Sequence, residues 1–94
     1  MATVVLGDFE WDDAKAASNL AKHTVSFEEA ASAMTDPLSV DFDDLVEPAN
    51  LVTLATSPTG RILYIVSTES HERIRIISAR AASRNERRRY EEAG

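Results

Sequence analysis

The chain has 94 residues and a net charge of −6, and its hydrophobic fraction of 44% is ordinary for a globular protein. A chain of this length builds one core, so we expect a single domain over residues 1–94. It contains no cysteine, which excludes disulfides, thiolate metal sites and a cysteine nucleophile.

The first residues do not resemble a secretory leader, because residues 1–6 are too short for an apolar signal core and four acidic residues follow by position 13. No apolar run approaches the roughly 20 residues that span a bilayer. We therefore expect a cytoplasmic protein without membrane contact.

The charges are unevenly distributed along the chain. Residues 1–47 hold 11 acidic and 2 basic side chains, whereas residues 48–94 hold 5 acidic and 8 basic ones, and all eight bases are arginine. This asymmetry predicts either an arginine-rich flank that meets a polyanion or an ordinary mixed surface.

The N-terminal third predicts an extended segment and a helix. Residues 3–11 begin with β-branched and end with aromatic side chains, which is typical of a strand, here with a break near Gly7. Asp12 is a suitable N-cap for an alanine-rich helix over residues 13–22.

A second helix is expected to begin at Ser26. Ser26 and Glu29 have the spacing of a capping box, in which each side chain satisfies a free backbone N–H. Phe27 and the following apolar residues recur at helical spacing. Pro37 ends this helix, because proline disfavours the α conformation in the residue before it.

The second half predicts a meander of strands. Residues 38–42 form a short strand, and the acidic stretch 43–50 reads as a loop. Strands are expected over residues 51–56, 61–68 and 73–80, with turns at 57–60 and 70–71. In a regular final strand Arg73 and Arg75 share one face, and Arg80 lies on the opposite face.

Ser83 and Glu86 form another capping box, which opens a C-terminal helix that runs to about residue 92. Few of its side chains are apolar, so we expect it to be short and peripheral, or to be completed by a partner. The fold class is therefore α+β: a small antiparallel sheet of three to five strands, two N-terminal helices packed on it and a C-terminal helix.

Four pieces of the sequence together resemble the BrnT family. The opening Phe9-Glu10-Trp11-Asp12 is followed by a group of matching residues: Lys15, Asn19, Lys22-His23, Val25 and Ser26-Phe27-Glu28-Glu29-Ala30. Asp36-Pro37-Leu38 comes next, and then Arg73-Ile74-Arg75-Ile76-Ile77-Ser78-Ala79-Arg80. The stretch 84–92 resembles the family's R-x-E-R-x-x-Y-E helix. The match extends from about residue 9 to residue 92, and the order and spacing of its pieces make it fairly specific.

The resemblance implies a RelE-like fold and a ribonuclease toxin that blocks translation. It also implies a neutralising BrnA-like antitoxin with a ribbon-helix-helix part. The complex is expected to bind operator DNA only through this antitoxin. The chain differs from the family pattern at Thr24, where glycine is usual, and at Ala81, where lysine is common. These departures leave an alternative open: a catalytically inactive BrnT-fold protein that acts only as an antitoxin-binding co-repressor.

Cleavage of RNA without a metal needs a group that assists the 2′-OH, cations for the phosphorane and an acid for the leaving 5′-oxygen. The resemblance directs attention to basic residues. We expect Arg80 to stabilise the phosphorane, unless it pairs with Glu86. His23 is a candidate for proton transfer, unless it only caps a helix end, and Lys22 and Arg61 are candidate supporting cations.

Three further arginines are candidate contacts to the RNA backbone, namely Arg73, Arg75 and Arg84. For Arg73 and Arg75, pairing with the acidic stretch 41–47 is an equally good interpretation. His71 lies in a predicted turn, where a surface role is favoured. Trp11 and Tyr64 are better explained as core anchors than as base-stacking residues. We expect neither a metal site nor a cofactor.

Overall fold

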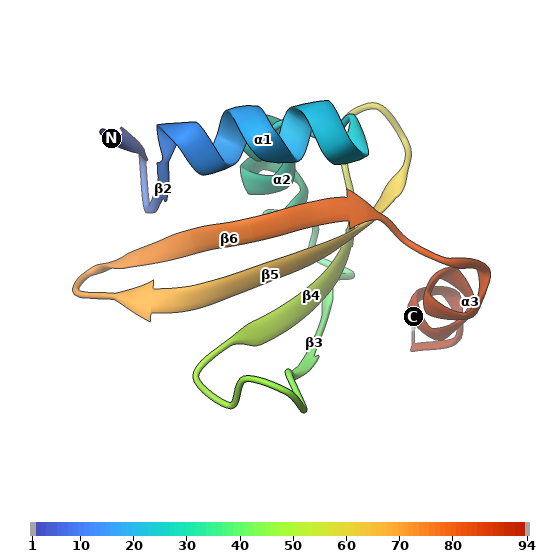
Figure 1. Ribbon diagram of the computed structural model, residues 1–94. Coiled ribbons are helices and arrows are strands. Elements are labelled where there is room, and N and C mark those ends of the chain that lie inside the picture. The colour runs from blue at the N-terminus through green and yellow to red at the C-terminus, as the bar shows by residue number, and fades with distance from the viewer. Residues whose placement is uncertain (1, 94) are drawn as a thin grey trace.

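The computed structural model describes residues 2–93, which form a six-stranded sheet and three helices. The elements in chain order are β1 (Thr3–Leu6), β2 (Phe9–Asp12), α1 (Asp13–His23), α2 (Phe27–Ala33), β3 (Val40–Asp43), β4 (Leu51–Thr56), β5 (Ile62–Ser70), β6 (Arg73–Ala81) and α3 (Arg84–Ala93). In Figure 1, α1 and α2 lie over one face of the sheet and α3 lies on the other side. No described helix is long and apolar enough to cross a membrane.

The sheet is larger and more varied in direction than the sequence predicts. Its strand order is β1-β2-β6-β5-β4-β3, so it has six strands rather than three to five. The segment expected as one interrupted strand is a hairpin, because Gly7 adopts a positive φ of 58° between β1 and β2. β2 pairs in parallel with β6 at Phe9 and Glu10, so the sheet is mixed rather than antiparallel.

The helix ends follow from local chemistry, as predicted. The Asp12 carboxylate accepts from the Lys15 N–H, and the Ser26 hydroxyl accepts from the Glu29 N–H. The box that opens α3 is complete, because Ser83 and Glu86 each accept the other's N–H. No described residue of α3 is buried, which agrees with its expected peripheral position.

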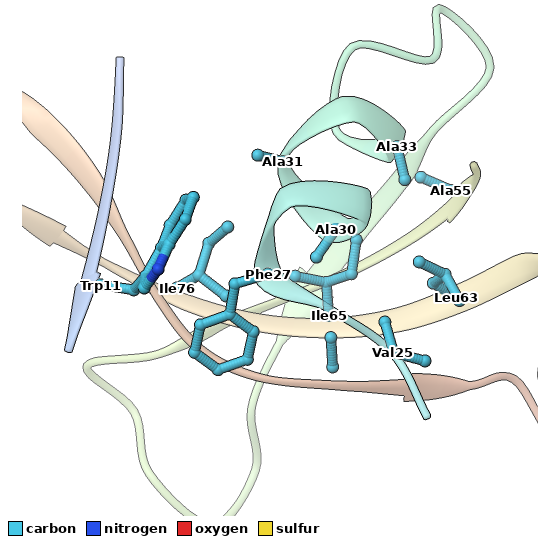
Figure 2. Packing of buried hydrophobic residues seen from close by; sticks show 11 residues of the cluster. Trp11, Val25, Phe27, Ala30, Ala31, Ala33, Ala55, Leu63, Ile65 and Ile76 are labelled. Atoms are coloured by element: carbon cyan, nitrogen blue, oxygen red, sulfur yellow. The ribbon is translucent and has the colours of Figure 1, made fainter. Parts of the chain in front are cut away.

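The core lies between the sheet and the two N-terminal helices. Trp11 of β2 and Phe27 of α2 meet edge to face at 6.0 Å, and both are buried. Ala30 and Ala33 of α2 belong to the same buried cluster as Leu63 of the sheet (Figure 2), and their small side chains let the helix pack closely on the sheet. Trp11 is therefore a core anchor, as the sequence favours, and is not available to stack on a base.

A β-bulge in β6 changes which arginines share a face. Val66 pairs with Ser78, but the next residue of β5 pairs with Ile76, so Ile77 is an extra residue on β6. An extra residue shifts the alternation of side chains by one position. Arg80 consequently lies on the same face as Arg75, and the predicted separation of these two arginines is wrong.

Candidate active site at the end of α1

The C-terminal end of α1 carries two of the predicted catalytic residues, Lys22 and His23. The helix ends at Thr24, which adopts the left-handed conformation with φ 56° and ψ 27° and donates its N–H to the Leu20 carbonyl. Threonine therefore occupies the left-handed cap that usually favours glycine. Both basic side chains are exposed at the helix end, where the helix dipole favours cations.

Lys22 and His23 face a surface hollow of about 210 Å³ between α1 and the edge of β6. Lys15 and Asn19 line the same hollow, because these positions recur on one side of the helix at helical spacing. Ile77, the bulge residue of β6, closes the other wall. Lys22 and His23 therefore reach one and the same hollow.

Asn19 fixes the position of the hollow against the sheet. Its amide donates to the Ala79 carbonyl at 2.8 Å and to the Val25 carbonyl at 3.0 Å, and its amide oxygen accepts the Ala79 N–H at 3.1 Å. β2 pairs only with the start of β6, so the Asn19 side chain satisfies the free edge of β6 where a neighbouring strand would otherwise lie. In the sequence, Asn19 stands out only as a polar residue in an alanine-rich helix. Its hydrogen bonds to the edge of β6 were not predicted.

The bases around this hollow have no internal counter-charge. Among the described residues, Lys15, Lys22 and His23 form no ion pair, and their side chains donate no hydrogen bond within the chain. Uncompensated cations around a hollow attract an anion such as a phosphate group.

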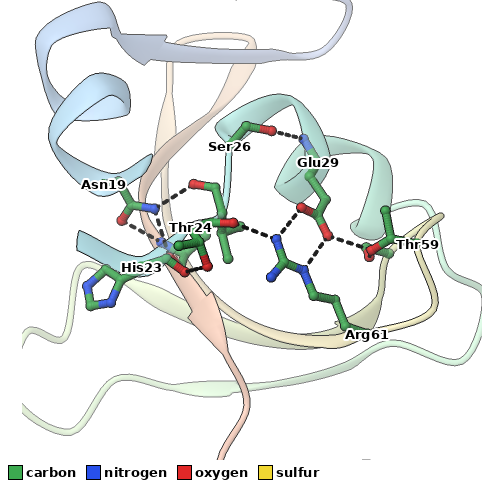
Figure 3. A network of polar contacts seen from close by, with 10 residues as sticks. Asn19, His23, Thr24, Ser26, Glu29, Thr59 and Arg61 are labelled. Carbon is green, nitrogen blue, oxygen red and sulfur yellow. Dashed lines mark hydrogen bonds and ion pairs between the residues drawn. The ribbon is translucent and has the colours of Figure 1, made fainter. Parts of the chain in front are cut away.

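Arg61, at the start of β5, lies beside this helix end and is held by Glu29 of α2 (Figure 3). Its Nε and Nη2 donate to the two Glu29 carboxylate oxygens at 2.8 and 2.6 Å, and Nη2 also donates to the Thr24 carbonyl at 2.7 Å. The hydrogen bonds from Arg61 lower the pKa of Glu29 to about 2. Nη1 of Arg61 has no partner among the described residues.

Glu29 was predicted to reach back to the N-terminus of its own helix, and it does not. Ser26 makes its half of the box, but the Glu29 carboxylate binds Arg61 and the Thr59 hydroxyl instead. The partners are 32 residues apart in the chain, so no local pattern indicates this pair.

Arg80 lies on the opposite face from His23, Lys22 and Arg61. Its Nη1 and Nη2 donate to the two Glu86 carboxylate oxygens at 2.7 and 2.9 Å, and its guanidinium stacks 3.9 Å from the centre of the Tyr64 ring. The pairing with Glu86 considered from the sequence is therefore present. The hydrogen bonds from Arg80 lower the pKa of Glu86, so the pair is ionised at neutral pH.

The residues predicted to bind the RNA backbone are dispersed. Arg75 donates to the buried Glu10 carboxylate at 2.5 Å, and not to the stretch 41–47 that the sequence offered as an alternative to RNA binding. Arg73 and Arg84 are exposed and lie on β6 and at the start of α3. His71 is exposed in the β5–β6 turn, as expected.

Comparison with known proteins places this arrangement in a class. The fold resembles the crystal structure of the Brucella abortus ribonuclease toxin, BrnT, with a TM-score of 0.64 and 21% sequence identity over 79% of this chain and 94% of that chain. No curated protein matches the chain by sequence. The six-stranded mixed sheet with its helices therefore has the fold of a small ribonuclease toxin.

A family model gives the particular family. The model for the ribonuclease toxin BrnT of type II toxin–antitoxin systems matches residues 11–86, which include the end of α1, Glu29, Arg61 and Arg80. The chain belongs to the BrnT family of toxins, and a family of this type implies an antitoxin partner.

Proposed function

We propose that this chain is an active ribonuclease and that it cleaves RNA by a metal-independent transesterification at the hollow beside the end of α1. The observation that supports this site is the cluster of Lys15, Lys22 and His23, in which both lysine charges are uncompensated within the described residues of a chain with net charge −6. Arg61, Arg75 and Arg80, by contrast, are each paired with a carboxylate of the same chain.

The proposed roles follow from the position of each group. Lys15 and Lys22 hold the phosphate, and His23 transfers a proton, taking it from the 2′-OH or giving it to the leaving 5′-oxygen. Arg61 uses its free Nη1 to stabilise the phosphorane, while Glu29 and the Thr24 carbonyl fix the guanidinium. Glu29 is a positioning residue in this account.

Arg80, which the sequence made the first choice for stabilising the phosphorane, is the second candidate in this proposal. To serve there it would have to leave Glu86, and it would approach the RNA from the opposite face of the sheet. We favour Arg61, because it shares its face with His23.

Purified chain incubated with RNA and EDTA tests the proposal. We expect cleavage in EDTA that leaves 2′,3′-cyclic phosphate ends, and loss of cleavage in EDTA would contradict the metal-free mechanism. His23→Asn should lower the rate by about 10²-fold or more. His71→Asn is the matched control, because it changes the other histidine, and asparagine tolerates the positive φ at that position.

The proposed partner is a BrnA-like antitoxin with a ribbon-helix-helix part. We propose that the chain binds operator DNA only through this antitoxin. Co-expression of the chain with the antitoxin should remove its toxicity. The complex, and not the chain alone, should shift operator DNA in a gel.

An inactive co-repressor is the second candidate function, and two observations favour it. Arg61, Arg75 and Arg80 are each neutralised by a carboxylate of the same chain, and Ala81 supplies no cation at the end of β6. The Ala81 side chain is exposed on the same sheet face as its partner Leu63, which is the face of α1. In this reading the parent chain does not cut RNA, and Ala81→Lys restores cutting.

A further inference from the structure

A second hollow, larger than the first, lies on the same sheet face beyond the end of α2. Its volume is about 470 Å³, and residues of β3, β4, β5 and β6 line it. The helices cover the β6 side of this face, whereas the sheet is open toward β3. We call this hollow the distal groove.

The distal groove combines an apolar lining with an acidic rim. Met34, Leu51 and Ile74 contribute the apolar surface. Asp41, Asp43 and Glu69 are exposed carboxylates that line it. Among the described residues, none of these three carboxylates is in an ion pair.

Two hydroxyl residues form the floor of the groove. Ser67 is 2% exposed and lines the groove. Neighbouring Thr53 donates its hydroxyl to Asp41 at 2.8 Å, which holds that rim carboxylate against the sheet.

The loop beside the groove enlarges its apolar surface. Residues 48–50 line the groove, and Leu45 and Val46, just before them, are 95% and 91% exposed. Two adjacent large apolar side chains in water favour coverage by a partner. Asp44 and Glu47 flank them, so the surroundings of these apolar residues are also acidic.

We infer that the distal groove receives a cationic, amphipathic segment of the antitoxin, with apolar side chains in the groove and Lys or Arg side chains against Asp41, Asp43 and Glu69. The inference rests on the antitoxin partner that the family implies, and not on the ribonuclease activity. An RNA strand would be repelled by this rim. A second copy of a chain with net charge −6 is also a poor match in charge.

The groove and the catalytic hollow therefore attract opposite charges. The hollow at the end of α1 collects bases and the distal groove collects acids, although both lie on one sheet face. If the basic residues of a partner bind in the distal groove, the rest of that partner is free to cover the hollow at the end of α1.

A designed peptide tests the chemistry of the groove. The probe is a labelled peptide of about 14 residues with the repeat Leu-Lys-Lys-Leu-Leu-Lys-Leu, which has a helical apolar stripe and a cationic face. Fluorescence anisotropy should show binding that weakens as salt is raised, because the pairing is electrostatic. Backbone amide NMR shifts should map it to residues 39–53 and 67–69.

Charge reversal supplies the specific variants. Asp43→Lys with Glu69→Lys should weaken peptide binding by about tenfold or more, whereas Glu91→Lys on the exposed side of α3 should leave it unchanged. Equal binding of a peptide with Glu in place of Lys, or shifts confined to the end of α1, would overturn the inference.

Co-expression with the antitoxin tests whether the antitoxin is the molecule that occupies the distal groove. The Asp43→Lys, Glu69→Lys chain should resist neutralisation by the co-expressed antitoxin, and unchanged neutralisation would contradict us. A dimer of the parent chain that the same variant abolishes would place a second copy in the groove instead. RNA cleavage by the variant should equal that of the parent, so failure here and failure of the proposed activity give different results.

Discussion

At the scale of single residues, the arginines differ sharply in what they can bind. Arg61, Arg75 and Arg80 each end on a carboxylate of the same chain, and two of these pairs use both carboxylate oxygens. An arginine held in this way has a fixed orientation and attracts a distant phosphate only weakly, although the free Nη1 of Arg61 can still donate to a phosphate that is already bound. Lys15 and Lys22, which form no ion pair among the described residues, therefore carry the attraction for RNA in our account.

The Glu29–Arg61 pair should make the protein sensitive to acid. The pKa of Glu29 falls from 4.5 to about 2 on folding, so the unfolded chain binds more protons between these values. The stability that the pair contributes is present above pH 4.5 and is lost as the pH falls toward 2. Glu29→Gln should lower the melting temperature near neutral pH and flatten its fall toward about pH 3. A parallel fall in parent and variant would contradict this assignment.

At the scale of elements, residues close together in the sequence predicted the helices, whereas the strand order of the sheet depends on pairings between residues far apart in the sequence. Capping residues such as Asp12, Ser26 and Ser83 act on neighbouring backbone groups, so the helix starts are readable from the sequence. The parallel pairing of β2 with β6 joins residues 65 positions apart, and the bulge at Ile77 breaks the regular alternation. Neither has a local signature.

Asn19 is the residue whose loss should weaken β6 most. Asn19→Ala leaves the Ala79 N–H and carbonyl and the Val25 carbonyl without their partner in a buried position. Each unsatisfied buried group costs about 1–3 kcal/mol, so we expect a loss of about 3 kcal/mol in the free energy of unfolding by urea. Ser18→Ala, an exposed neighbour, is the control. An equal effect of both variants would show that Asn19 has no special role.

α3 is held to the sheet by a few identifiable contacts. The Tyr90 hydroxyl donates to Asp36 and accepts from the Thr56 hydroxyl at 2.9 Å, and Arg89 stacks on Phe42. Desolvation opposes ionisation of Asp36, but hydrogen bonds from the Thr56 N–H, Tyr90 and the Leu38 N–H outweigh it and lower its pKa.

Tyr90→Phe should therefore loosen α3 by about 1–2 kcal/mol without disturbing the core. Hydrogen exchange is expected to quicken at the amides of α3 and to stay unchanged at those of β5 and β6. Arg88→Ala is the matched control, because Arg88 is exposed and forms no ion pair among the described residues. Protection of α3 that is identical in parent and Tyr90→Phe would show that these hydrogen bonds do not hold the helix.

At the scale of the whole molecule, the sequence predicted the α+β class and the family, but it did not predict how the candidate site is divided. Lys22 and His23 line one hollow, and the β4–β5 turn brings Arg61 to the Thr24 carbonyl, one residue after His23. Arg80 was grouped with them, but the strand alternation sends it to the face that α3 covers. That division depends on tertiary pairing, which a linear motif does not encode.

The most direct test of this account is RNA integrity and growth after the chain is induced without antitoxin, beside His23→Asn and Arg80→Ala at matched protein levels. We predict arrest with RNA breakdown for the parent, loss of both with His23→Asn, and retention of most activity with Arg80→Ala. Loss with Arg80→Ala and retention with His23→Asn would move the site to the opposite face. No arrest from the parent would contradict the ribonuclease proposal and favour the co-repressor.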